Sequence, residues 1–88
     1  YVDFITPVPS SVKAFDTLEV QAVYYEDGVE TQEPIEYTLF GADPESYSYE
    51  TDGNILTIHF WKYSEASLGI KATCNDREVV TKTRIEGY

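Results

Sequence analysis

Hydrophobic and polar residues alternate along most of this chain. In the segment 17–25, Leu18, Val20 and Ala22 alternate with polar residues, and the segment stops at the turn pair Asp27-Gly28. Alternation with a period of two is typical of a strand with one buried face, and Asp-Gly is a common turn sequence. The same pattern returns in four further segments, 35–41, 55–61, 68–74 and 78–86.

Shorter extended segments complete the expected set. We predict them at 2–5, 12–15 and 47–50, with a brief extension at 29–31. Pro7 and Pro9 follow the first segment, and proline lacks the backbone donor that a central strand needs. The first segment is therefore expected to be an edge strand that bends or switches partners. The pair Asp52-Gly53 predicts a tight hairpin between the segments 47–50 and 55–61.

These segments predict the fold class. No stretch shows helical periodicity for more than a turn, and seven to eight short strands are separated by turn sequences. This pattern indicates an all-β protein, an antiparallel sandwich of two sheets. A chain of 88 residues corresponds to one domain, residues 1–88. Because the chain starts at Tyr1 and contains no methionine, we expect it to be excised from a larger multidomain protein.

Parity along each strand predicts which side chains face the core. In the last strand we assign the odd positions to the inward face, which leaves Lys82 and Arg84 in water. The opposite choice would bury an unpaired cation at a cost of several kcal/mol. Val80 is then expected outside. The predicted inward residues are Val20, Ala22, Tyr37, Leu39, Leu56, Ile58, Phe60, Leu68, Ile70, Ala72, Cys74, Val79, Thr81, Thr83 and Ile85.

The charge of the chain limits its partners. The net charge is −10, which repels nucleic acid and anionic lipid, so neither is expected as a partner. No apolar run approaches the roughly 18 residues of a membrane span, and no membrane insertion is expected. Residues 1–60 carry twelve acidic residues and one basic residue, whereas residues 61–88 carry four acidic and five basic residues. The last third is therefore the only electropositive part.

The core and turn residues resemble those of bacterial immunoglobulin-like domains. The resemblance covers nearly the whole chain and is carried by the segments 22–30, 53–58 and 68–73, and by Tyr37-Thr38-Leu39. It implies an immunoglobulin-like β-sandwich and is closest to copies appended to structural proteins of phages of Gram-positive bacteria. Such relatives commonly have Trp where this chain has Tyr37, whose hydroxyl needs a partner inside the core.

Catalytic and metal chemistry is sparse. Cys74 is the only cysteine, so no internal disulfide is possible, and we expect it to be a buried apolar filler. The single histidine, His59, falls on the outer face of its strand and cannot meet that cysteine. We expect no enzymatic activity and no cofactor. One His and one Cys cannot supply a zinc set; weak calcium binding stays open at Asp27, Glu30 and Glu33, or at Asp52 with Asn54.

Aromatic residues are the one feature that points to recognition. Tyr47, Tyr49, Trp61 and Tyr63 fall at strand ends or on the short strand, where exposed rings beside carboxylates suit sugar binding. They form a possible ligand platform. The alternative is that they cap the open ends of a small sandwich.

Basic residues on the last strands form a second candidate surface. Lys71, Lys82 and Arg84 should lie on one outer face, near Glu36, if their strands share a sheet. We expect a cross-strand charge ladder there, or a docking face for an acidic partner.

Two functions follow from these observations. The resemblance implies a non-catalytic structural or adhesion module of a phage tail or capsid protein, acting as spacer, decoration or weak host-surface binder beside neighbouring domains of the parent protein. The alternative is a carbohydrate-binding or adhesion module of a bacterial cell-surface multidomain protein, with a cell-surface glycan as partner. Either places the chain on a virion or outside the cell.

Overall fold

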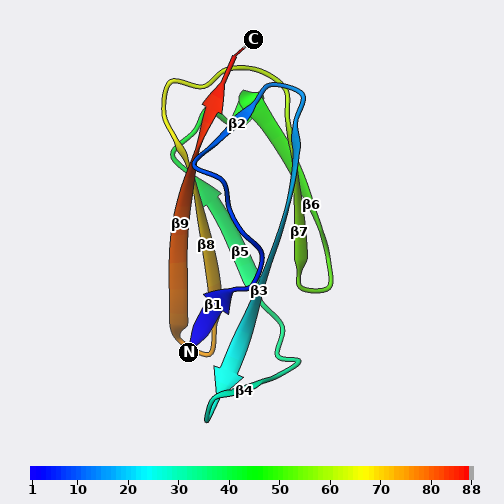
Figure 1. The fold of residues 1–88 in the computed structure, drawn as a ribbon, viewed down its shortest axis with the longest axis vertical. Coiled ribbons are helices and arrows are strands. Elements are labelled where there is room, and N and C mark those ends of the chain that lie inside the picture. Colours follow the sequence, from blue (N-terminus) through cyan, green and yellow to red (C-terminus); the bar gives the residue numbers. More distant parts are fainter. Residues whose placement is uncertain (88) are drawn as a thin grey trace.

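A computed structural model describes residues 1–87 and shows two β-sheets packed face to face (Figure 1). Within these residues there are nine strands and one short 3₁₀ helix. The predicted all-β sandwich is confirmed, and the strand count reaches nine because the brief extension expected at 29–31 forms a two-residue strand. The elements are β1 (Val2–Phe4), β2 (Ser11–Lys13), β3 (Thr17–Glu26), β4 (Val29–Glu30), β5 (Glu36–Phe40), η1 (Pro44–Ser46), β6 (Tyr47–Asp52), β7 (Ile55–Phe60), β8 (Leu68–Cys74) and β9 (Arg77–Glu86).

The strands divide into two sheets. Sheet 1 has the order β1-β3-β7-β6, with β4 paired to β3; sheet 2 has the order β2-β9-β8-β5. All pairings are antiparallel except that of β2 with β9, which is parallel. The first segment therefore passes from sheet 1 to sheet 2 across Pro7 and Pro9, as its prolines predict. This arrangement is an immunoglobulin-like β-sandwich.

Tight turns close three hairpins. Asp27-Gly28 and Asn75-Asp76 have positive φ at both loop positions, as type I′ turns require. The β6–β7 hairpin is confirmed, but its turn lies one residue later than predicted. Asp52 pairs with Ile55, so the two loop residues are Gly53 and Asn54. Gly53 has a φ of 60°, the sign that a type II′ turn needs at its first loop position.

The core follows the predicted parity. Val80 is 46% exposed, as expected, and the side chains on either side of it point inward. Burying these apolar side chains is the main stabilising contribution, about 1.5–3 kcal/mol for each large one. Eleven predicted inward residues are buried, Val20, Ala22, Leu56, Ile58, Phe60, Leu68, Ile70, Ala72, Cys74, Thr83 and Ile85; Tyr37, Leu39, Val79 and Thr81 are half-buried.

Tyr37 connects the two sheets through the core. It lies on β5 of sheet 2, and its hydroxyl donates to the carbonyl of Asn54 (2.6 Å) and accepts from the backbone N–H of Ala22 (2.8 Å) in sheet 1. The partner required for this hydroxyl is thus supplied by the backbone of the facing sheet. Burial raises the pKa of Tyr37, although the Ala22 N–H acts in the opposite direction.

The body is elongated, with principal extents of 44 × 20 × 19 Å. Tyr1 lies toward the lower end in Figure 1, whereas β9 runs to the upper end. The two ends of the described chain are therefore separated along the long axis. No helix within residues 1–87 has the length and apolar character needed to cross a membrane.

Candidate functional site

Two of the four platform residues lie at the open edge of the sandwich. Tyr47 pairs with Phe60 and Tyr49 pairs with Ile58, both core residues. Directly paired residues point to the same face of a sheet, so both tyrosines point to the core side of β6. Their rings lie 6.5 Å apart. Tyr47 packs against the core, which raises its pKa through desolvation, and Tyr49 is 54% exposed.

The other two platform residues lie elsewhere. Trp61 follows β7, and its ring stacks on His59 at a centroid distance of 6.0 Å. Because His59 pairs with Thr17 on the outer face of sheet 1, Trp61 lies on the opposite side of that sheet from the two tyrosines. Tyr63 is exposed in the loop 61–67. The structure therefore divides the predicted platform into separate parts.

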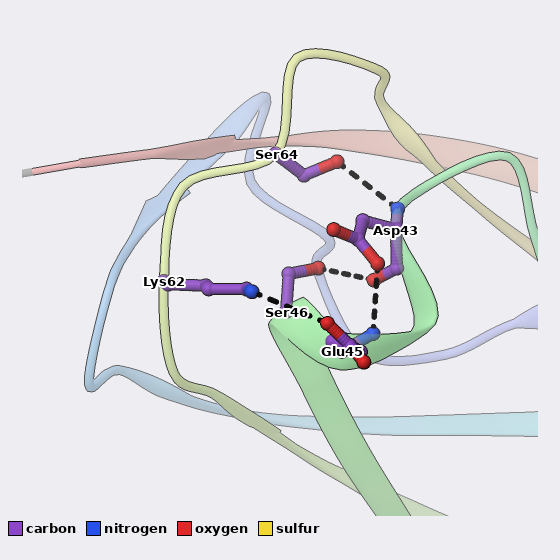
Figure 2. A network of polar contacts seen from close by, with 5 residues as sticks. All are labelled: Asp43, Glu45, Ser46, Lys62 and Ser64. Atoms are coloured by element: carbon purple, nitrogen blue, oxygen red, sulfur yellow. Dashed lines mark hydrogen bonds and ion pairs between the residues drawn. The ribbon is translucent and has the colours of Figure 1, made fainter.

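A polar network fixes the segment that carries Trp61 (Figure 2). The Asp43 N–H donates to the Ser64 hydroxyl (3.1 Å), and the Ser46 hydroxyl donates to the Asp43 carbonyl (2.6 Å). Both serines are buried. The backbone N–H of Trp61 donates to the Ser46 carbonyl (2.7 Å), so the main chain that carries the indole is fixed. An exposed ion pair between Lys62 and Glu45 (3.6 Å) lies at its rim.

A pocket of about 430 Å³ lies on the outer face of sheet 1. Thr31, Gln32 and Pro34 of the loop 31–35 form one wall. Its apolar side chains are Val23, Pro34 and Ile55, whereas the remaining lining is rich in amides and carboxylates. The polar lining residues are Gln21, Glu30, Thr31, Gln32, Asp52 and Asn54, with Gly53 at the turn.

Asn54 holds this loop in place. Its side-chain oxygen accepts from the Ile35 N–H (2.9 Å), and its amide group donates to the Glu33 carbonyl (2.9 Å). At the other end of the loop, the Thr31 hydroxyl and N–H both donate to the Tyr24 carbonyl. The pocket wall is therefore fixed by hydrogen bonds at both ends.

Sequence reasoning did not find this pocket. One signal was present: Val23 and Ile55 are apolar at positions that parity places on the outer face. Val23 is nonetheless only 4% exposed, and it lines the same pocket as Thr31, Gln32 and Pro34 of the loop. Apolar residues at outward positions of neighbouring strands indicate that another segment packs over them.

His59 joins two polar side chains on the same face. Its Nδ1 lies 3.3 Å from the Thr17 hydroxyl and its Nε2 lies 3.3 Å from a carboxylate oxygen of Glu50. A hydroxyl, an imidazole and a carboxylate are thus aligned. The alternation along single strands did not predict this, because the three residues lie on three different strands. Both contacts are long and solvent-exposed, and neither carries the short, sheltered geometry of an activated nucleophile.

Lys71, Lys82 and Arg84 all lie on the outer face of sheet 2, as predicted. Lys71 forms a cross-strand ion pair with Glu78 (3.7 Å), and within residues 1–87 no ion pair joins Glu36 to these cations. Glu36 and Glu78 both pair with Thr73, so each lies diagonally from Lys71, on β5 and β9 respectively. Within residues 1–87, Lys82 and Arg84 have no ion-pair partner, and their positions are open to solvent.

The residues at which weak calcium binding stayed open do not form a metal cluster. No cluster of three or more His, Cys, Asp or Glu side chains able to hold a metal ion occurs in the described part of the chain. The Asn54 side chain is engaged by the loop backbone. Cys74 is a free and buried thiol, and burial raises its pKa, with Glu33 adding to the effect; it is the apolar filler that was predicted.

Comparison with known proteins adds no relative. No protein-family model, curated protein or solved structure matches this chain.

Proposed function

We propose that this chain is a non-catalytic immunoglobulin-like module of a phage tail or capsid protein, where it acts as a spacer, decoration or weak host-surface binder. The observation that carries the proposal is the separation of its two ends along a body 44 Å long. Domains attached to the two ends would be held apart by nearly the full length of the sandwich. Neighbouring domains of the parent protein are its first expected partners.

The strand pairing at the chain ends also suits a stiff connector between domains. β1 is paired to sheet 1 and β2 to sheet 2, so the N-terminal segment is attached to both layers. β2 also pairs in parallel with β9, the last strand of the described chain. Both ends are thus anchored to paired strands, and hinge motion at the module ends is restricted.

The spacer role is tested by a distance measurement. The chain is inserted between two rigid, spin-labelled domains, and the label separation is measured by double electron-electron resonance. A flexible glycine-serine linker of 88 residues is the matched control. We expect one narrow distance distribution for the module and a broad one for the linker. An equally broad distribution for the module would contradict the spacer role.

Placement in a virion requires a separate test. Particles of the phage whose genome encodes the chain are purified and analysed by mass spectrometry, with proteins of the lysed host as the control. Peptides of this chain should co-purify with the particles in fixed stoichiometry to a tail or capsid protein. Their absence from purified particles would exclude the virion role while leaving the spacer role intact.

A second candidate function is supported by the pocket on sheet 1. A fixed, polar, concave site on a β-sandwich face suits a carbohydrate-binding or adhesion module of a bacterial cell-surface protein, whose partner is a surface glycan. Binding of intact cell-wall polysaccharide to the immobilised chain tests this function. A saturable response that soluble sugar competes away would support it, and a flat response would contradict it.

A further inference from the structure

We propose that the pocket on the outer face of sheet 1 binds an amino sugar with a free ammonium group, as one unit of a longer polysaccharide that runs along the sheet toward Trp61. This proposal rests on the carbohydrate-binding candidate and deepens it by naming the ligand class. It is independent of the spacer role.

The pocket has the size and rigidity of a ligand site. Its volume of about 430 Å³ lies within the 300–1,000 Å³ typical of small-molecule sites. The loop 31–35 is already fixed by Asn54 and by the Tyr24 carbonyl. Because the loop is already ordered, binding costs less conformational entropy than it would at a mobile loop.

The lining offers hydrogen-bonding groups that the protein itself does not use. Within residues 1–87, the side chains of Gln21, Gln32, Glu30 and Asp52 have no hydrogen-bond or ion-pair partner. An amide supplies both donors and an acceptor, which matches the hydroxyl groups of a sugar ring, whereas a carboxylate only accepts. The half-buried apolar side chain of Ile55 offers contact to the C–H face of the ring.

Charge selects among sugars. The pocket is lined by two carboxylates and no cation, and the chain carries a net charge of −10. Acidic sugars are therefore repelled, whereas an ammonium group gains a charge-assisted hydrogen bond to either carboxylate. No aromatic ring lines the pocket, so ring stacking does not supply the attraction there. An amine-bearing hexose fits these features better than a neutral one.

The outer face continues the polar surface away from the pocket. Beyond the row that contains Gln21 and Asp52, the next row carries Glu19 and Glu50, and the next contains His59. Trp61 stacks on His59 at the far end and is 50% exposed. At about 3.3 Å per residue, the six steps from Ile55 to Trp61 span roughly 20 Å. Only an oligosaccharide reaches from the pocket to the indole.

Nuclear magnetic resonance titration tests the pocket. The ¹⁵N-labelled chain is titrated with glucosamine, N-acetylglucosamine and glucose at low salt, with ethanolamine as a non-sugar ammonium. We expect saturable shifts of Gln21, Gln32 and Asp52 signals, with glucosamine at least tenfold tighter than N-acetylglucosamine. Equal responses to glucosamine and ethanolamine, or no saturable shifts, would overturn the proposal. Stronger binding of calcium chloride at the same signals would also overturn it.

Matched variants separate the pocket from general charge. Asp52→Asn should weaken glucosamine binding about threefold to tenfold at low salt, and Gln32→Ala should weaken it without changing the charge. Glu36→Gln removes one acidic group on the far sheet and should leave binding unchanged. Thermal unfolding of each variant verifies the fold. Equal losses in Asp52→Asn and Glu36→Gln would mean that net charge alone attracts the ligand.

Chain length tests the path to Trp61. A fully deacetylated glucosamine hexamer should shift the pocket signals and also change the Trp61 fluorescence, whereas the monosaccharide should shift only the pocket signals. Trp61→Phe removes the fluorescence change and retains the pocket shifts. A hexamer that leaves the indole unaffected would overturn the proposed path. The distance measurement on the spacer is unaffected by any of these results, so the two proposals fail separately.

Discussion

The outer faces of the two sheets follow the same alternation but differ in charge, because that of sheet 2 combines basic residues with Glu36, Glu78 and Glu86. The middle of the outer face of sheet 1 is acidic and hydroxylated, with Glu19, Glu50 and Thr57 in one row. The outer face of sheet 2 holds four of the six basic residues of the chain, Lys13, Lys71, Lys82 and Arg84. The net charge of −10 therefore hides a molecule with two unlike sides.

The two faces also cover their outward apolar residues differently. On sheet 1, Val23 and Ile55 lie in the pocket that Thr31, Gln32 and Pro34 of the loop 31–35 also line. On sheet 2 the ring of Phe40 lies across Gly69, its neighbour on β8. A loop leaves a cavity beneath it, whereas a flat ring fills the surface that it covers. This difference explains why the candidate binding site lies on sheet 1.

The largest expected effect comes from removing the Tyr37 hydroxyl, whose hydrogen bonds join the two sheets. Tyr37→Phe removes the hydroxyl that donates to Asn54 and leaves the buried N–H of Ala22 without an acceptor. We expect the free energy of unfolding to fall by about 1–3 kcal/mol. Urea denaturation measures the loss. Amide exchange should accelerate at Ala22 and the pocket wall more than on β9, because the severed contacts belong to sheet 1.

Two controls sharpen this prediction. Tyr24→Phe removes a hydroxyl that makes no hydrogen bond within residues 1–87, and should change stability by less than about 0.5 kcal/mol. Thr83→Val removes a buried hydroxyl that has no hydrogen-bond partner among residues 1–87, and should be neutral or stabilising. If Tyr37→Phe were as mild as Tyr24→Phe, the connection between the sheets would contribute little.

Alkaline pH should weaken the same connection. Burial raises the pKa of Tyr37 in the folded state, so its stabilising contribution is complete below the unfolded value of about 10 and declines as pH rises above it. One such proton changes the unfolding free energy by up to about 1.4 kcal/mol per pH unit. Denaturation between pH 9 and 11.5 should therefore show a steeper loss for the natural chain than for Tyr37→Phe. Parallel slopes would contradict a buried, protonated hydroxyl.

On sheet 2, the Phe40 ring should determine whether Gly69→Ala stabilises or destabilises the fold. A Cβ at Gly69 would clash with the Phe40 ring, so Gly69→Ala must displace the ring. Phe40 is 41% exposed and can rotate outward, so we expect a loss of only about 0.5–1 kcal/mol. In a Phe40→Ala background the same change should stabilise by about 0.4–1 kcal/mol, because alanine restricts the unfolded chain.

A double-mutant cycle measured by thermal unfolding checks this reversal. The opposing effects identify ring coverage of the glycine backbone as the cause. The same sign in both backgrounds would mean that Gly69 is required for its own backbone conformation and not for the ring above it.

The sequence predicts what depends on neighbours along the chain. Every residue that parity placed inward is buried or half-buried, and Asp27-Gly28 and Asn75-Asp76 were placed in turns, because strand faces and tight turns are local properties. The β6–β7 turn was displaced by one residue, because Asp-Gly and Gly-Asn are both good turn pairs. Only the pairing of Asp52 with Ile55 decides between them.

The sites depend on residues that are distant in sequence. The pocket requires Asn54 to hold Ile35, 19 residues away, and no local pattern encodes that bond. Likewise, the strand registers place both Glu36 and Glu78 diagonally from Lys71, and only the folded structure shows that the ion pair forms with Glu78. The tyrosines of β6 and Trp61 were grouped by position in the chain, but the β6–β7 register places them on opposite sides of sheet 1.

The smallest predicted effect concerns the charges of the two faces themselves. The triple variant Lys71→Gln, Lys82→Gln and Arg84→Gln makes the net charge more negative by three, and Glu19→Gln, Glu50→Gln and Asp52→Asn makes it less negative by three. Self-repulsion of an acidic chain should make the first variant less stable and the second more stable, by some tenths of a kcal/mol per residue at low salt. The exposed Lys71–Glu78 pair adds slightly to the first loss.

Thermal unfolding at low salt and at 1 M salt distinguishes this effect from local contacts. At 1 M salt the screening length is about 3 Å, so both differences should nearly vanish. Shifts that persist at high salt would indicate specific contacts on that face. If the sheet 2 variant also lost an acidic binding partner while keeping its unfolding temperature, that face would be a docking surface. Because the two variants change charge equally and oppositely, unequal shifts would show that the local surroundings of each face, and not net charge, determine its contribution.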